Sequence, residues 1–437
     1  METPAEAMTH LLAFGRKKLR AMSSRSYRVV SPSTNTSSAP LNSVIEFKIP
    51  GNQMAAFLDN NSCYFKFNVK NTDAGENFSF EGKAGAYGLI KKFEILTAGQ
   101  TIDTIDEYGV LFSAMADTDS STLYAENNGK ILYGADSDAF AGNVVGLNVV
   151  AAGGERVVCL PLVLNSLANS RKYIPLFSRD NLTIRLTLND ITNAGISTAT
   201  VANLITNTQI VLDQPELVYN VVELSADAFQ AVSASVDNVF QIVSDTYRHT
   251  SSNVDANASQ THIANLGFAF SSLNRVIICQ RETANIVVNK AALGNRCVRG
   301  LSQANLLLNG ASIPERPIKI GASCATALAE TLIADRSLVA YDSISRVGDS
   351  LAYNSQTPSG ATTNVGAFVL QIDTESMRSE SDDPGIYAGV STIGSVLQAQ
   401  LEYGAANNVA VKLDFFAQFT QLLTLDMNAS QTFIASV

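Results

Sequence analysis

The sequence contains no tryptophan and few histidines or cysteines among its 437 residues. The three histidines lie far apart, without the spacing of metal ligands. The five cysteines are odd in number and form no C-x-x-C pair, so the sequence indicates neither a disulfide framework nor a zinc site. Several lie in apolar runs, which predicts buried thiols in a protein assembled in a reducing compartment; the five are Cys63, Cys159, Cys279, Cys297 and Cys324.

Long apolar runs are also lacking. No stretch approaches the roughly 18 residues of a membrane span, and no apolar segment follows a basic start, so no secretory signal peptide is predicted. Charged residues make up 16% of the chain, against about 25% in an average protein. So few ionised groups favour a chain whose flanks are buried against copies of itself. A large monomer with a polar, uncharged surface is the alternative.

Catalytic motifs are lacking as well. The glycine-rich segment 82–88 does not have the G-x-G-x-x-G spacing of a nucleotide-binding loop, and segment 389–394 misses the nucleophile-elbow spacing by one residue. Asp373 and Glu375 share a strand face, but no opposing acid is evident. The acidic segment 380–383 lacks the ligand spacing of a calcium loop. We therefore predict no enzymatic activity, no catalytic or metal site and no cofactor.

What the sequence does contain begins with a basic amphipathic segment. Thr3 and Glu6 form a capping box and Pro4 occupies the first helical position, which predicts a helix over residues 3–22. Residues 1–28 carry six basic and two acidic side chains, whereas the rest of the chain carries 24 and 38. At helical spacing, one face is apolar and basic residues flank it; the residues concerned are Met8, Leu11, Leu12, Leu19 and Met22, with Arg16, Lys17, Lys18 and Arg20.

Such an arm has several possible partners: a neighbouring subunit, a membrane surface or nucleic acid. Residues 23–43 are polar and interrupted by prolines, so we expect a flexible tether there. The predicted domains are thus 1–43 for the arm and tether, 44–222 for a first unit and 223–437 for a second.

Strand patterns dominate both units. Residues 181–189 alternate between leucine or isoleucine and polar side chains, as a half-buried strand does. Leu306–Leu308 precede Asn309-Gly310, the strongest short hairpin signal, and Pro314 and Pro317 then hold the exit extended. Further strands are predicted at 45–49, 63–69, 93–96, 102–105, 156–164, 208–222, 239–244, 262–270, 275–280, 304–308, 367–372, 395–402, 410–419 and 422–426.

The two units share an order of elements. Each has several strands, a short helix (near 108–115 and at 325–334), a long polar stretch (117–155 and 342–364) and more strands. Two packed, eight-stranded antiparallel units explain this order most simply. The predicted fold is all-β, with two tandem jelly rolls, short helices and an amphipathic N-terminal arm.

Five segments in this order resemble the double jelly-roll major capsid proteins of the adenovirus and tectivirus lineage, including those of virophages and polinton-like viruses. The segments are KYIPLFSRDNLTIRLTLND (172–190), LLLNGASIPERPI (306–318), GAFVLQIDTE (366–375), GVSTIGSVLQAQLEY (389–403) and VKLDFFAQFTQLLTLDM (411–427). Two features depart from the family: the chain is short for a eukaryotic member, and it has no tryptophan.

The resemblance implies a homotrimer that forms a pseudo-hexameric capsomer and tiles an icosahedral shell in the virion. The long polar stretches would face outward and the N-terminal arm inward. Implied partners are copies of the chain, penton and minor capsid proteins, and an internal membrane or the genome through the arm. The alternative is a jelly-roll carbohydrate-binding or fibre-like surface protein. Two features argue against this alternative. The chain has no tryptophan, and its phenylalanines occupy strand positions that are predicted to face the core; they are Phe65, Phe67, Phe268, Phe270, Phe415 and Phe419.

Overall fold

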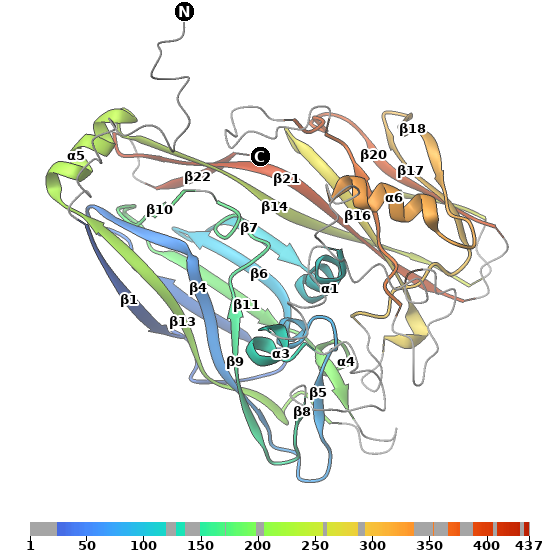
Figure 1. Cartoon of the computed structure of the whole chain (residues 1–437), viewed down its shortest axis with the longest axis horizontal. Coiled ribbons are helices and arrows are strands. Elements are labelled where there is room, and N and C mark those ends of the chain that lie inside the picture. Colours follow the sequence, from blue (N-terminus) through green and yellow to red (C-terminus); the bar gives the residue numbers. More distant parts are fainter. Residues whose placement is uncertain are drawn as a thin grey trace, which may run out of the picture.

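A computed structural model describes residues 24–118, 128–135, 149–170, 172–197, 205–256, 260–286, 293–335, 353, 366–375, 388–404, 409–428 and 432–436. Every strand pairing among them is antiparallel, apart from one isolated bridge (Figure 1). The all-β prediction is confirmed. Residues 1–23, which include the predicted helix 3–22, lie outside the described residues, as do most of 117–155 and 342–364.

Residues 24–224 form two large sheets and one small one. The largest has the order β1-β13-β4-β10, with β2 beside β13 and β9 beside β4. Its strands are β1 (Ser24–Pro32), β2 (Ser38–Pro40), β4 (Ala56–Asn71), β9 (Glu155–Pro161), β10 (Ile174–Pro175) and β13 (Ile210–Leu224). The facing sheet has the order β3-β11-β6-β7, with β3 (Val44–Ile49), β6 (Ile90–Thr97), β7 (Gln100–Asp106) and β11 (Leu182–Leu188).

Short elements close one end of this first half. The small sheet has the order β12-β5-β8, and Figure 1 shows β5 and β8 beside α3, at the end opposite the start of β1. The elements are β5 (Phe78–Phe80), η1 (Ala86–Leu89), α3 (Lys130–Tyr133), β8 (Val149–Val150), α4 (Ile191–Ala194) and β12 (Gly195–Ser197).

The second half repeats the two-sheet plan. One sheet has the order β14-β21-β16-β19, with β22 beside β21, and the other β15-β20-β17-β18. The strands are β14 (Val239–Val254), β15 (Thr261–Asn265), β16 (Leu273–Glu282), β17 (Leu301–Leu308), β18 (Ala311–Lys319), β19 (Leu370–Asp373), β20 (Leu397–Tyr403), β21 (Val411–Asp426) and β22 (Phe433–Ser436); the helices are α5 (Ala226–Ser235), η4 (Thr283–Asn285) and α6 (Ala325–Ala334).

Local sequence explains the clearest elements. In β11 the side chains of Leu182, Ile184, Leu186 and Leu188 are buried, and the residues between them are half-buried, as the period of two requires. At the tip of the β17–β18 hairpin, Asn309 and Gly310 have φ values of 50° and 83°. Positive φ at both central residues is what a type I′ turn demands, and Asn-Gly supplies it most readily.

Two expectations were wrong. The segment predicted to be a tether contains β1, which pairs with β13 from Ser24 opposite Leu224 to Pro32 opposite Glu216. Its polar composition concealed the strand, whose Tyr27 and Val29 pack on the core. The closing strands predicted at 410–419 and 422–426 are one strand, β21, because Thr420 and Gln421 continue the pairing with β14.

The predicted boundary after Val222 falls inside β13, and the division into domains stays a prediction.

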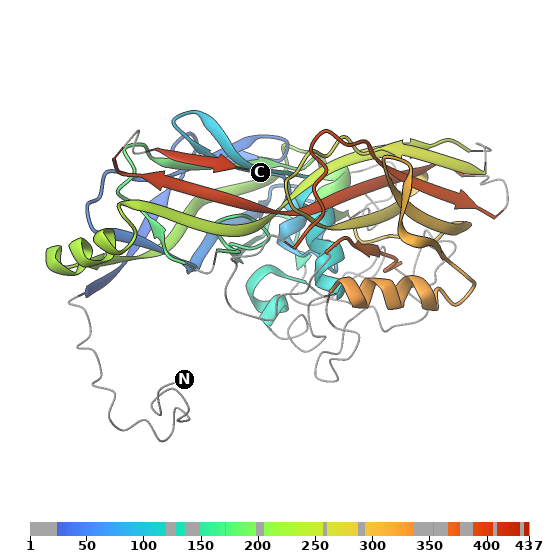
Figure 2. The same ribbon diagram turned by 90° about the horizontal axis from the view of Figure 1, so that it is seen from above.

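The buried side chains of both halves form one continuous cluster. The paired strands β14 and β21, each 16 residues long, run almost the whole length of the molecule (Figures 1 and 2). Their outer ends therefore pack on the first half. The two halves are tied together by the longest strands of the second.

Candidate assembly surface and the junction behind it

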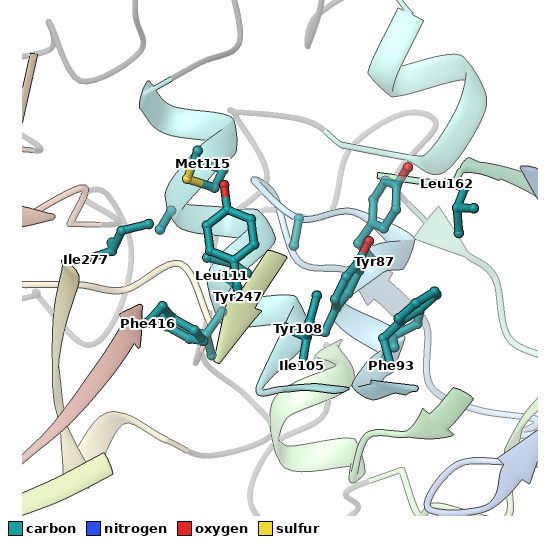
Figure 3. Packing of buried hydrophobic residues seen from close by; sticks show 14 of the residues in the cluster. Tyr87, Phe93, Ile105, Tyr108, Leu111, Met115, Leu162, Tyr247, Ile277 and Phe416 are labelled. Atoms are coloured by element: carbon teal, nitrogen blue, oxygen red, sulfur yellow. The ribbon is translucent and has the colours of Figure 1, made fainter. Parts of the chain in front are cut away.

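Helix α1 (Tyr108–Thr118) lies at the centre of the junction between the two halves. Nearly all of its side chains are buried, as expected for a helix that is covered on every side. Tyr108 stacks on Phe93 of the first half, with ring centroids 5.6 Å apart. In Figure 3, Leu111 and Met115 point instead toward side chains of the second half. The labelled partners there are Tyr247, Ile277 and Phe416.

Charged groups are buried beside this helix. The guanidinium of Arg296, from the second half, forms an ion pair with Asp117 of α1 and donates a 3.0 Å hydrogen bond to the Ser113 hydroxyl. Lys83 lies 2.8 Å from the same carboxylate and donates to the Gly366 carbonyl at 3.1 Å. Burial lowers the pKa of Lys83, an effect that the adjacent carboxylate opposes. These contacts fix α1 against both halves.

A second charged cluster surrounds Asp414 on β21. Arg281 lies 2.7 Å and His249 3.0 Å from its carboxylate oxygens. Lys412, 3.4 Å from Asp414, also pairs at 3.1 Å with Glu107, which immediately precedes α1. Burial alone would raise the pKa of Asp414, but the charge of Arg281 and the His249 hydrogen bond hold it well below its ordinary value. The cluster therefore joins the sheet of the second half to the first half.

A third polar contact lies where β14 crosses the first half. The Thr246 hydroxyl donates to Asp103 of β7 at 2.7 Å, and the Gln421 side chain donates to the Ile102 carbonyl at 2.8 Å. Burial raises the pKa of Asp103, although hydrogen bonds from Ser166 and Thr246 oppose the shift. All three contacts are specific in direction and register, so they set the angle between the two halves.

Whereas the junction buries charged and polar side chains, the outer edges of the sheets expose apolar ones. Several large apolar side chains on edge strands are exposed: Val30 on β1 by 51%, Val157 on β9 by 56%, Ile263 on β15 by 54% and Ile434 on β22 by 56%. An edge strand with exposed apolar side chains is a template for pairing with another chain. These four side chains define what we call the apolar edges.

One edge is protected. β18 ends the β15-β20-β17-β18 sheet opposite β15, and carries exposed Glu315, Arg316 and Lys319 together with Pro314 and Pro317. Charges and prolines on an edge discourage strand addition. The two edges of one sheet thus differ in their suitability for contact.

A groove opens at the α5 end of the molecule, where the start of β14 meets the first half. Its volume is about 810 Å³, and its lining is mainly apolar. Phe57 and Phe240 lie at its base, where both contact Phe177, with ring centroids 5.5 and 4.8 Å away. The other lining residues are Lys172, Tyr173, Pro175, Val222, Leu224, Val232, Val236, Asp237, Val239, Gln241 and Ile242.

The residues dismissed as enzyme motifs have structural roles where they are described. Asp373 and Glu375 line a small polar pocket of about 280 Å³ with Arg275, which forms an ion pair with Asp335. Glycine-rich 82–88 leads into η1, and segment 380–383 lies outside the described residues. Among the residues described, no group of His, Cys, Asp or Glu could hold a metal ion, and no helix is long and apolar enough to cross a membrane.

The predicted arm residues, Met8, Leu11, Leu12, Arg16, Lys17, Lys18, Leu19 and Arg20, lie outside the described residues. Of the cysteines, Cys63, Cys279, Cys297 and Cys324 are buried free thiols, as predicted, whereas Cys159 is only half-buried. Sequence reasoning missed the junction charges and the groove. The residues of each feature are far apart in the chain; Asp117 and Arg296, for example, are separated by 179 positions. No local sequence pattern could have shown that they lie together.

Neither a protein-family model nor a curated protein matches the chain. Solved structures do. The fold matches PBCV-1 VP54, as fitted into a reconstruction of the virophage Sputnik, over 97% of this chain and 99% of that one, with a TM-score of 0.63 and 11% identity. The Sputnik virophage structure matches over 94% of this chain and 88% of that one, with a TM-score of 0.60 and 13% identity. The Faustovirus major capsid protein matches over 95% of this chain and 92% of that one, with a TM-score of 0.59 and 10% identity.

These solved proteins are all double jelly-roll capsid proteins. The chain described here has their fold along almost its entire length, and the likeness that its five segments suggested is confirmed at the level of the fold.

Proposed function

We propose that this chain is a viral major capsid protein that forms a homotrimeric, pseudo-hexameric capsomer and tiles an icosahedral shell. The observation that carries the proposal is the fold, which is shared with capsid proteins over nearly the full length of both chains. The apolar edges support it, because six jelly rolls around a threefold axis need flanks that adhere to other copies. The proposed role is structural and located in the virion.

The positions of elements at the two ends of the first half support an N-terminal arm that faces the shell interior. The start of β1, where the arm joins, lies beside α5, whereas α3, β5 and β8 lie at the other end (Figure 1). We propose that the arm end faces the shell interior and that the end carrying α3, which belongs to the predicted outward stretch 117–155, faces outward. Penton and minor capsid proteins are the further proposed partners. For the arm, an internal membrane or the genome stays open.

The alternative of a carbohydrate-binding or fibre-like protein finds no support in the six phenylalanines that the sequence analysis considered. Such modules use exposed rings, but the phenylalanines singled out in the sequence are all at most 5% exposed; they are Phe65, Phe67, Phe268, Phe270, Phe415 and Phe419.

Analytical ultracentrifugation and electron microscopy of the purified chain test the proposal. We expect a species of three times the 46.6 kDa chain mass and, at higher concentration or altered ionic strength, hexagonal tiles or closed shells. A chain that stays monomeric under every ionic condition would contradict the capsid role and favour a binding module.

A further inference from the structure

The groove at the α5 end is an apolar surface beside the point where the undescribed N-terminal segment joins the fold. Ser24 is the first residue of β1 and is paired with Leu224, which lines the groove. An extended chain spans at most about 3.6 Å per residue. Residues just before Ser24 therefore start within a few ångströms of the groove wall, and the segment is held there at a high effective concentration.

The lining matches the apolar face of that segment. Val232 of α5 and Val236, the C-cap residue of that helix, line the groove together with Phe57, Val222 and Leu224 of the first half, and Val236 is 38% exposed. In a helix over residues 3–22, Met8, Leu11, Leu12, Leu19 and Met22 would form one stripe. Leu19 and Met22, in its last turn, would be nearest to Ser24.

The charges also fit. Asp237 lines the groove, and Asp227 lies in the first turn of α5; both are exposed. Lys172 is a basic lining residue on the other wall. Of the four basic residues, Arg16 and Lys18 lie nearest to the apolar stripe at 100° per residue, whereas Lys17 and Arg20 lie farther around the helix. A docked arm would thus place basic residues near the acidic ones and leave Lys17 and Arg20 exposed.

We propose that residues 3–22 fold back as an amphipathic helix and dock their apolar face into this groove of the same chain. The groove would exclude water from Leu19 and Met22, and the acidic residues near it would attract the basic flanks. The proposal does not depend on the capsid role, because the contact is within one chain and exists before any assembly.

Engineered disulfides in the full chain test it. One variant combines Leu19→Cys with Val236→Cys, and a matched control combines Lys17→Cys with Val236→Cys. In a helix Lys17 lies about 200° around the axis from Leu19, so both cysteines are equally tethered but only one faces the groove. We expect the Leu19 variant to form the intrachain disulfide roughly tenfold faster under mild oxidation, because a disulfide requires Cα atoms within about 7 Å.

The native cysteines interfere little. Burial raises the pKa of Cys63, Cys279 and Cys297 to about 12, and the unsubstituted chain measures the background from half-buried Cys159. Peptide mapping by mass spectrometry locates each disulfide, and non-reducing electrophoresis separates linkage within a chain from linkage between chains. Circular dichroism shows that each variant remains folded.

Three outcomes would overturn the proposal. Equal rates for Leu19→Cys and Lys17→Cys would mean that the arm collides with the groove at random. Disulfides formed only between chains would place the arm on another copy. No preference for Leu19, combined with sedimentation of the full chain with phosphatidylserine vesicles, would identify a membrane anchor instead.

Discussion

The junction between the two halves and the outer edges of the sheets, which we propose as contact surfaces between copies, have opposite chemistry. At the junction Arg281, Arg296 and Asp414 are almost completely buried, whereas at the edges Val157 and Ile263 are more than half exposed. A buried ion pair adds little net stability, yet any wrong arrangement leaves an uncompensated charge. Apolar contact is non-directional. We infer that the junction sets one fixed angle and that the edges supply adhesion.

The same contrast recurs within one sheet. β15 exposes Ile263, and β18, at the opposite edge, carries charges and prolines. The proposed closed assembly would need some edges open and others protected. The predictions below test these contrasts, from the largest expected effect to the smallest.

Removing a buried ion pair at the junction should lower the free energy of unfolding more than any other change proposed below. Arg296→Met removes one of the two cationic partners of Asp117 and leaves Lys83 alone to compensate the buried carboxylate. We expect the free energy of unfolding to fall by about 3–5 kcal/mol, the typical cost of breaking a buried ion pair. Urea unfolding followed by circular dichroism measures it. As a control, Lys66→Ala breaks the Lys66–Glu216 pair, in which the Lys66 side chain is 47% exposed, and should cost less than about 1 kcal/mol. Equal losses would refute the distinction.

Acid should weaken the same junction through Asp414. Its folded-state pKa lies below its ordinary value, so its contribution is present above the unfolded pKa of about 4. That contribution is lost as the pH falls toward the lower folded value. We expect the wild-type chain to be more stable than Asp414→Asn at pH 7, and the difference to shrink below pH ~4. A difference that stays constant with pH would show that the carboxylate charge is unimportant.

Sequence reasoning worked best where the determining pattern is local. Alternation fixed β11, the Asn309-Gly310 turn fixed the β17–β18 hairpin, and α6 has the bounds expected for it. The sequence analysis did not predict β1, because the strand depends on its pairing with β13, about 190 positions away in sequence. The junction charges and the groove are likewise built from distant segments. The arm residues were recognised from their periodicity, but their location stays a prediction.

The two edges of one sheet can be compared by adding the same charge to each. Ile263→Lys on β15 should weaken self-association about tenfold, equivalent to about 1.4 kcal/mol, because the substitution removes apolar contact and adds a charge to an edge. Ala311→Lys on β18 should have little effect, since Ala311 is exposed on an edge that is already charged. Sedimentation equilibrium of both variants measures the association constants. Equal weakening would mean that β15 is not a preferred contact.

The smallest effect should be seen at Cys159, which reports on the β9 edge. Its side chain is half-buried on the same strand face as exposed Val157, and burial raises its pKa. In the unassembled chain we expect iodoacetamide to label Cys159 before Cys63, Cys279 and Cys297, whose pKa values of about 12 keep them protonated. Labelling should accelerate as the pH rises toward the pKa, because the thiolate is the reactive form. If the β9 edge is covered by a neighbouring copy, assembly should slow the labelling of Cys159 severalfold at fixed pH. An unchanged rate would remove β9 from the set of contact edges and leave β1, β15 and β22.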